Sequence, residues 1–150
     1  MKWGLLLLAL LFSACADGQA GPWVEAIERA NADADKAIAK RDLPVAIEVL
    51  TQAAGLDPRG VASDDLRAVR ADLYYRIAEL ELARGYPSTA RTRADQGLAL
   101  GTPDDVYTAN LYIVRGRANE ALNVQRAAID DYHRALVINE ALLEDLLEDP

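Results

Sequence analysis

One residue of this 150-residue chain combines a reactive group with a setting that would use it: Cys15, the only cysteine. A lone cysteine cannot form an intramolecular disulfide, and proteins of oxidising compartments avoid a free thiol unless it has a task. Acylation of the sulfur would be such a task. His133 is the only histidine, so it cannot complete a metal cluster, and no serine has a base at a recognisable spacing. We therefore expect no catalytic residue, no metal site, no cofactor and no enzymatic activity.

The residues before Cys15 have the pattern of a secretory signal peptide. Lys2 gives a positive start, residues 3–12 form an uncharged, leucine-rich run, and small residues follow. That run is too short to span a bilayer. Its end has two interpretations. Leu-Phe-Ser-Ala-Cys at 11–15 resembles a bacterial lipobox, in which the cysteine is acylated, although Phe12 replaces the usual aliphatic residue. Ordinary cleavage after Ala14-Cys15-Ala16 is the alternative, and it would remove the cysteine.

The lipobox interpretation divides the chain into three parts. They are a signal peptide at 1–14, a lipidated Cys15 with a flexible, small-residue tether to residue 21, and a helical domain at 22–150. It places the protein in the bacterial cell envelope, held by its acyl chain. Ala16, where an aspartate would signal otherwise, resembles the outer-membrane sorting pattern, with the domain facing the periplasm. Cleavage after Ala16 would instead give a soluble periplasmic or secreted protein.

The net charge of the chain limits the classes of partner that it can bind. Lys2 is the only charged residue before Cys15, so 15 of the 16 basic residues face all 24 acidic ones, a net charge of −9. Such a chain repels phosphate backbones and anionic lipid surfaces. We expect no nucleic-acid partner and no membrane contact beyond the acyl anchor.

Glycine and proline recur at regular places and divide the rest of the chain into helices rich in Ala, Leu, Glu and Arg. Ser63 and Thr102 have the residue types of N-caps. No alternating strand pattern occurs. The predicted helices are 23–41, 44–56, 63–84, 88–100, 103–122 and 124–139.

Nine small residues predict how these helices pair. In three triplets the spacing is twelve residues and then seven, and closely crossing helices need small side chains where their axes meet. The spacing therefore predicts three helical hairpins. The triplets are Ala34, Ala46, Ala53; Ala78, Ala90, Gly97; and Gly116, Ala128, Ala135.

This pattern resembles the tetratricopeptide repeat, most closely at Tyr112, Gly116, Ala128, Tyr132 and Ala135. The resemblance covers about residues 27–141 and implies an all-α, right-handed α-solenoid of about three hairpins. The spacings between repeats are longer than usual, and Arg115 stands where the family has an apolar residue. Residues 140–150 carry a leucine stripe at 142–147 and read as a C-terminal capping helix, or as a helix that packs on another chain.

The resemblance also implies a function. In this family the first helix of each hairpin lines a concave groove that binds peptides or partner proteins. Apolar contacts, backbone-reading amides and two arginines suggest an acidic or carboxylate-bearing peptide with one apolar anchor. Some residues assigned to this surface by the same register can instead pack between hairpins, Ile38 and Leu82 first among them. The further residues that the register assigns are Glu28, Ala32, Ile38, Ala39, Leu82, Ala83, Glu120 and Ala121. The candidate groove residues are Asn31, Asp35, Asp72, Tyr75, Arg76, Glu79, Asn110, Ile113, Val114 and Arg117.

The sequence thus predicts a lipid-anchored, non-enzymatic adaptor of the bacterial envelope that binds a protein or peptide. A structural protein that self-associates through its C-terminal segment is the alternative. Neither the partner nor the pathway follows from the residues.

Overall fold

A computed structural model describes residues 21–58 and 61–148, and within them every regular element is an α-helix. The expected all-α class is confirmed. The predicted signal peptide, Cys15 and the tether up to residue 20 lie outside the described residues. The helices are α1 (Gly21–Ala39), α2 (Leu43–Ala54), α3 (Ser63–Ala83), α4 (Pro87–Leu98), α5 (Val106–Ala121) and α6 (Gln125–Glu148).

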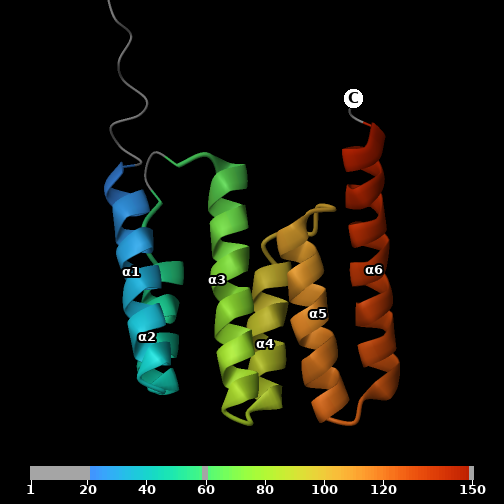
Figure 1. Ribbon diagram of the computed structural model, residues 1–150, viewed down its shortest axis with the longest axis horizontal. Coiled ribbons are helices and arrows are strands. Elements are labelled where there is room, and N and C mark those ends of the chain that lie inside the picture. Colours follow the sequence, from blue (N-terminus) through green and yellow to red (C-terminus); the bar gives the residue numbers. More distant parts are fainter. Residues whose placement is uncertain (1–20, 59–60, 149–150) are drawn as a thin grey trace, which may run out of the picture.

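The helices form three hairpins that stand side by side (Figure 1). α1 pairs with α2, α3 with α4, and α5 with α6; α2 then packs on α3, α4 on α5, and α3 also on α5. The turn between α3 and α4 contains Gly85 (φ 80°), and the turn between α5 and α6 contains Asn123 (φ 60°). Glycine and asparagine tolerate this positive φ, which ends the preceding helix. The hairpins therefore follow one another in chain order and are joined through their neighbouring helices.

The nine small residues are all buried, as the spacing predicted. Gly97 and Gly116 have no room for a side chain. A Cβ on Gly97 would lie 2.6 Å from Leu111 Cδ2, and one on Gly116 would lie 2.7 Å from Tyr132 Cε1. The small residues therefore mark the close helix crossings.

Two predicted N-caps are wrong. Ser63 lies inside the first turn of α3, after Ala62, which makes no side-chain capping bond. Thr102 does not cap α5, which starts at Val106. The cap of α5 is Asp105, whose Oδ1 accepts a hydrogen bond of 2.8 Å from the Thr108 amide. The first helix of the third hairpin is accordingly shorter than the spacing between repeats suggested.

The separate C-terminal capping helix is also wrong, because α6 is one continuous helix from Gln125 to Glu148. No glycine or proline occurs between these residues, and leucine, alanine and glutamate favour the helix. In Figure 1 the C-terminal end of α6 extends beyond α5. Its last turns therefore lack a neighbour within the described chain.

The core is divided between the hairpins. Large apolar residues fill the space among α1, α2 and α3, where Leu50, Leu73 and Ile77 are wholly buried. Between the second and third hairpins the core is made of smaller residues around Val114 and Ala118. A further buried cluster between these two hairpins includes Leu98 and Leu111.

Candidate functional site

Nine of the ten predicted groove residues keep some exposure to solvent. Asp35 and Arg117 are exposed, and the others are partly exposed: Asn31, Asp72, Tyr75, Arg76, Glu79, Asn110 and Ile113. Val114 is the exception. It has no exposed surface and packs with Ala78, Ala90, Ala94 and Ala118. The interpretation of Val114 as an apolar groove contact is therefore wrong, because its side chain belongs to the core.

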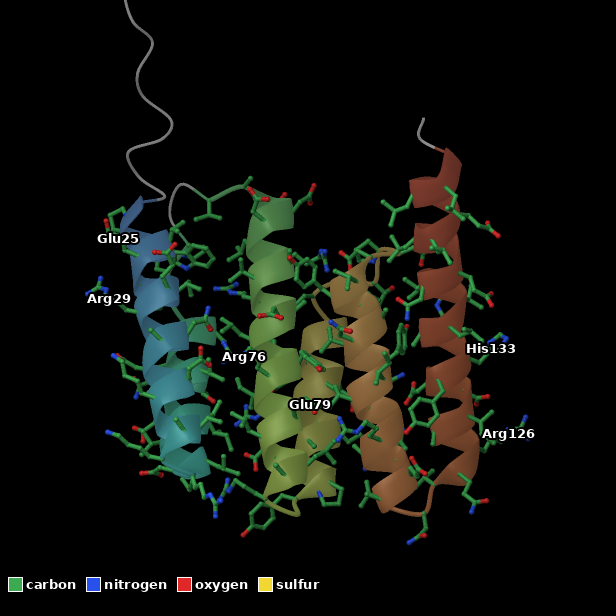
Figure 2. All side chains as sticks on the ribbon, in the orientation of Figure 1. Glu25, Arg29, Arg76, Glu79, Arg126 and His133 are labelled. Carbon is green, nitrogen blue, oxygen red and sulfur yellow. The ribbon has the colours of Figure 1, made fainter. Side chains whose placement is uncertain are left out.

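Arg76 joins the first two hairpins. From α3 it reaches α1, where its Nη1 donates to Asn31 Oδ1 and its Nη2 to Asp35 Oδ1, both at 2.6 Å. Figure 2 shows Arg76 between these two helices. All three residues were assigned to the groove, yet Arg76 lies 45 positions from Asn31 and 41 from Asp35 in sequence. The fold therefore brings groove positions of neighbouring hairpins together.

A second contact joins the next pair of hairpins in the same way. Arg117 of α5 donates to Glu79 of α3 and forms an ion pair with it. Farther along, the Tyr132 hydroxyl of α6 donates to Glu120 Oε2 of α5 at 2.8 Å. These contacts form what we call the polar row, which runs across α1, α3, α5 and α6. Its members are Asn31, Asp35, Arg76, Glu79, Arg117, Glu120 and Tyr132.

Charged groups of the polar row influence the ionisation of one another and of two neighbours outside the row, Asp72 and Tyr75. Burial raises the pKa of Asp72, against the opposing effect of Arg76. Burial, and then the carboxylate of Glu79, raises the pKa of Tyr75. The hydrogen bond to Glu79 raises the pKa of Arg117 despite its partial desolvation. Tyr75 is therefore neutral and Arg117 charged at neutral pH.

A hollow of about 380 Å³ opens beside the polar row. Its lining combines two apolar residues, Leu82 and Ala121, with the charged side chains of Arg117 and Glu120. The register had assigned all four to the groove. Because Leu82 also packs against buried residues of the second core cluster, it is only partly exposed. This hollow can hold a small apolar side chain next to a charged group.

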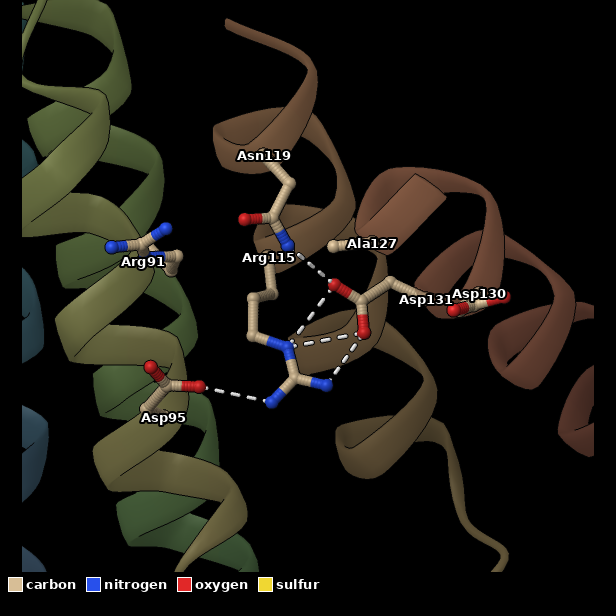
Figure 3. Close-up of a pocket in the computed structure, with 7 residues that line it drawn as sticks. All are labelled: Arg91, Asp95, Arg115, Asn119, Ala127, Asp130 and Asp131. Atoms are coloured by element: carbon tan, nitrogen blue, oxygen red, sulfur yellow. Dashed lines mark hydrogen bonds and ion pairs between the residues drawn. The ribbon is translucent and has the colours of Figure 1, made fainter. Parts of the chain in front are cut away.

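A second polar cluster, which the sequence interpretation missed, joins the last three helices (Figure 3). The guanidinium of Arg115 donates to both carboxylate oxygens of buried Asp131 at 2.5–3.1 Å, and its Nη1 donates to Asp95 at 2.9 Å. Asn119 Nδ2 donates to Asp131 Oδ2 at 2.9 Å. Burial opposes the charge of Arg115, but its hydrogen bonds outweigh that and raise its pKa. The one signal was an arginine at a position where the repeat expects an apolar residue.

This cluster ties helices together, because its charged groups satisfy one another. It lines a shallow hollow of about 320 Å³ whose walls also include Arg91, Ala127 and Asp130. With Arg115 shared between two carboxylates, the cluster holds α4, α5 and α6 at one spacing. We interpret it as structural.

The chain matches no known protein family, no curated protein and no solved structure. Among the described residues, no helix is long and apolar enough to cross a membrane. Nor does this part of the chain contain a group of three or more His, Cys, Asp or Glu residues that could hold a metal ion.

Proposed function

We propose that the protein is a non-enzymatic adaptor whose first helices bind an extended peptide or a segment of a partner protein. The observation that carries this proposal is the polar row. Groove positions assigned by the tetratricopeptide register in separate hairpins contact one another, as Arg76 contacts Asp35 and Arg117 contacts Glu79. A single surface made from equivalent positions of successive hairpins is what a repeat protein uses to bind a chain.

The proposal includes the finer description of the fold, a right-handed α-solenoid of three tetratricopeptide-type hairpins. It is supported by the order of helix contacts and by the nine buried small residues at equivalent positions. The proposal also keeps the acyl anchor at Cys15, in the bacterial envelope and facing the periplasm. That part rests on the sequence of residues 1–16 alone.

The contacts change the ligand that we expect. Both arginines of the surface are already bonded to acids of the chain, so a ligand carboxylate would have to displace Asp35 or Glu79. With Asp72 and Glu120 the surface carries four acids against two arginines, a local excess of negative charge. Complementary charge favours a basic ligand over the acidic peptide that the residue types alone suggested.

We therefore propose a segment with a lysine or arginine next to a small apolar residue. The basic group would lie against Glu79 and Glu120, where it shares their carboxylates with Arg117 and Tyr132. The apolar residue would occupy the hollow beside Leu82 and Ala121. The partly exposed amides of Asn31 and Asn110 would bind peptide backbone elsewhere along the surface, as the resemblance implies.

The test is site-specific photocross-linking in the cells that make the whole chain. A photoreactive residue in place of Tyr75, at the centre of the surface, is expected to give a discrete cross-linked species. The same residue in place of Glu48, exposed on α2, is the control and should give none. Adding Glu79→Gln and Glu120→Gln should abolish the cross-link, while Glu48→Gln with Asp130→Asn, at exposed acids of the second helices, should preserve it.

Charge reversal separates the two kinds of ligand. Arg76→Glu with Arg117→Glu should weaken capture of an acidic ligand and preserve or strengthen capture of a basic one, with helical circular dichroism as the check on folding. Loss of the cross-link in this variant alone would favour the acidic ligand. A cross-link at the Glu48 position but not at Tyr75 would show that the partner binds the second helices, and the adaptor surface would then be wrongly assigned.

A further inference from the structure

The outer face of α6 carries a row of apolar side chains that nothing in the described chain covers. Ile129, Leu136 and Leu143 are 65%, 54% and 57% exposed, and they are spaced seven residues apart. Seven residues make almost two helical turns, so the three side chains lie above one another. Leu147, four residues after Leu143, continues the row. We call these four residues the α6 stripe.

The equivalent positions in the first two hairpins show what this face of a second helix packs against. With Ala46, Ala90 and Ala128 aligned, Leu136 corresponds to Ala54 of α2 and Leu98 of α4. Both are buried, Ala54 in a cluster with leucines of α3 and Leu98 beside Leu111 of α5. Each is thus covered where the next hairpin packs. No hairpin follows α6 in the described chain, so the corresponding face of α6 stays apolar and exposed.

We infer that the α6 stripe is an interface between two copies of this chain, joined by antiparallel pairing of their α6 helices. The spacing is the first reason. Ile129 lies seven residues before Leu136 and Leu143 seven after, and Leu136 falls at the middle of Gln125–Glu148. In an antiparallel pair, Leu136 meets Leu136 of the second copy, and Ile129 meets Leu143. The helices then overlap along their whole length, about 36 Å, in a closed two-fold arrangement.

Charge is the second reason. The first half of α6 carries the bases Arg126, His133 and Arg134, whereas the second half has acids and no base, among them Glu140 and Glu144. In Figure 2 Arg126 and His133 both point away from the rest of the molecule. Antiparallel pairing brings His133 next to Glu140 of the second copy. Parallel pairing would place the acidic halves together, where like charges repel.

This interface is separate from the polar row, which lies mainly along α1, α3 and α5 and reaches α6 only at Tyr132, a residue outside the α6 stripe. A dimer would present two such surfaces, each on its own three hairpins. Binding of a repeated or dimeric partner would then gain from both sites at once.

Sedimentation of the protein isolated from cells that express the whole chain tests the association. We expect the unaltered protein to sediment with twice the mass of one chain. The Leu136→Glu variant should have the mass of one chain and the same helical circular dichroism. Val45→Glu likewise replaces an exposed aliphatic residue with glutamate but lies on α2; it is the matched control and should remain a dimer. A monomeric wild type at the highest soluble concentration, or a dimeric Leu136→Glu variant, would overturn the inference.

Cysteine cross-linking tests the orientation. A disulfide needs Cα atoms about 4.4–6.8 Å apart, so Leu136→Cys should cross-link to itself on mild oxidation. Ile129→Cys should not cross-link alone but should do so when mixed with Leu143→Cys. The unaltered protein, with Cys15 as its only cysteine, is the control. Self-cross-linking of Ile129→Cys, or none through Leu136→Cys, would exclude the antiparallel pair even if the protein is a dimer.

Discussion

The ring of Tyr132 lies directly against the backbone of Gly116, so closely that a Cβ on Gly116 would be 2.7 Å from Tyr132 Cε1. The hydroxyl of the same ring donates to Glu120, one turn farther along α5. Tyr132 thus closes the crossing of α5 and α6 with its ring and takes part in the polar row with its hydroxyl. The absence of a side chain at residue 116 is what permits both.

Substitution of Gly116 should destabilise the protein because Tyr132 must move. We expect Gly116→Leu to lower the free energy of unfolding by about 1–3 kcal/mol through overpacking. Gly116→Ala should cost less, since alanine favours the helix by about 0.5–1 kcal/mol over glycine. In a Tyr132→Ala background the penalty of Gly116→Ala should largely disappear. Urea unfolding followed by circular dichroism measures all four variants, and an unchanged midpoint for Gly116→Leu would contradict the close crossing.

The ionisation of Tyr132 gives a pH prediction. Burial and the hydrogen bond to Glu120 raise the pKa of Tyr132 to about 12. Between the ordinary tyrosine pKa, about 10, and that value, the unfolded chain loses a proton that the folded protein keeps. Stability from this group is therefore present below pH 10 and falls as the pH rises through this window. In a titration of tyrosinate absorbance, Tyr132→Phe should remove a phenol that ionises above the ordinary tyrosine pKa. Loss of a phenol that ionises at the ordinary pKa would contradict the raised pKa of Tyr132.

Asp105 serves two structural roles that substitutions can separate. Its Oδ1 caps α5, and its Oδ2 forms an ion pair with Arg67 of α3. Asp105→Asn keeps a capping oxygen but removes the charge, whereas Asp105→Ala removes both. We expect the alanine variant to lose about 1–2 kcal/mol and the asparagine variant to lose less in thermal unfolding. Equal losses would mean that the cap contributes nothing, and Asp104→Ala, a change at the neighbouring exposed acid, is the control.

The polar cluster on Asp131 should be among the most sensitive places in the protein. Asp131→Ala removes both carboxylate oxygens that accept from Arg115 on α6 and leaves that charge with Asp95 alone. Breaking a buried pair costs about 3–5 kcal/mol, and partial exposure of Arg115 places this variant at or below the lower end. Arg115→Met with Asp131→Leu should recover much of the loss, since no charge is then stranded. A double variant less stable than Asp131→Ala would show that the cluster stabilises the fold by more than charge neutralisation.

The sequence predicted features that depend on local pattern. The breakers placed five of the six helices within about three residues, and small residues at equal spacing predicted the close crossings. The Thr102 cap failed for a tertiary reason: threonine and aspartate are both good N-cap types, but Asp105 also pairs with Arg67. The end of α6 failed for a local reason, because the change of composition at residue 140 was read as a boundary although no helix breaker occurs there.

The candidate surface was predicted in outline but not in its contacts. Register placed Arg76 and Asp35 on one face, yet their pairing depends on the separation of α1 and α3, which no local pattern encodes. Val114 followed the same register and is buried, because Ala78, Ala90 and Ala94 let the helices approach that side of α5. The repeat therefore assigns a face, and the size of neighbouring side chains decides which of its residues solvent can reach.

The last prediction concerns Cys15, which lies outside the described residues and rests on sequence alone. If Cys15 is acylated, the protein should fractionate with membranes, and metabolic labelling with a fatty acid should mark it. Cys15→Ala should abolish both the label and the membrane association while the helical domain stays folded, because Trp23 is the first buried residue of the part of the chain that the structure describes. Ser13→Thr, a conservative change two residues earlier, is the control and should keep some label. A wild-type protein that is soluble, unlabelled and begins at Asp17 would show that the signal peptide is cleaved after Ala16. The adaptor surface and the α6 interface would then belong to a protein that diffuses freely, and the dimer would be the means by which two binding surfaces are held together.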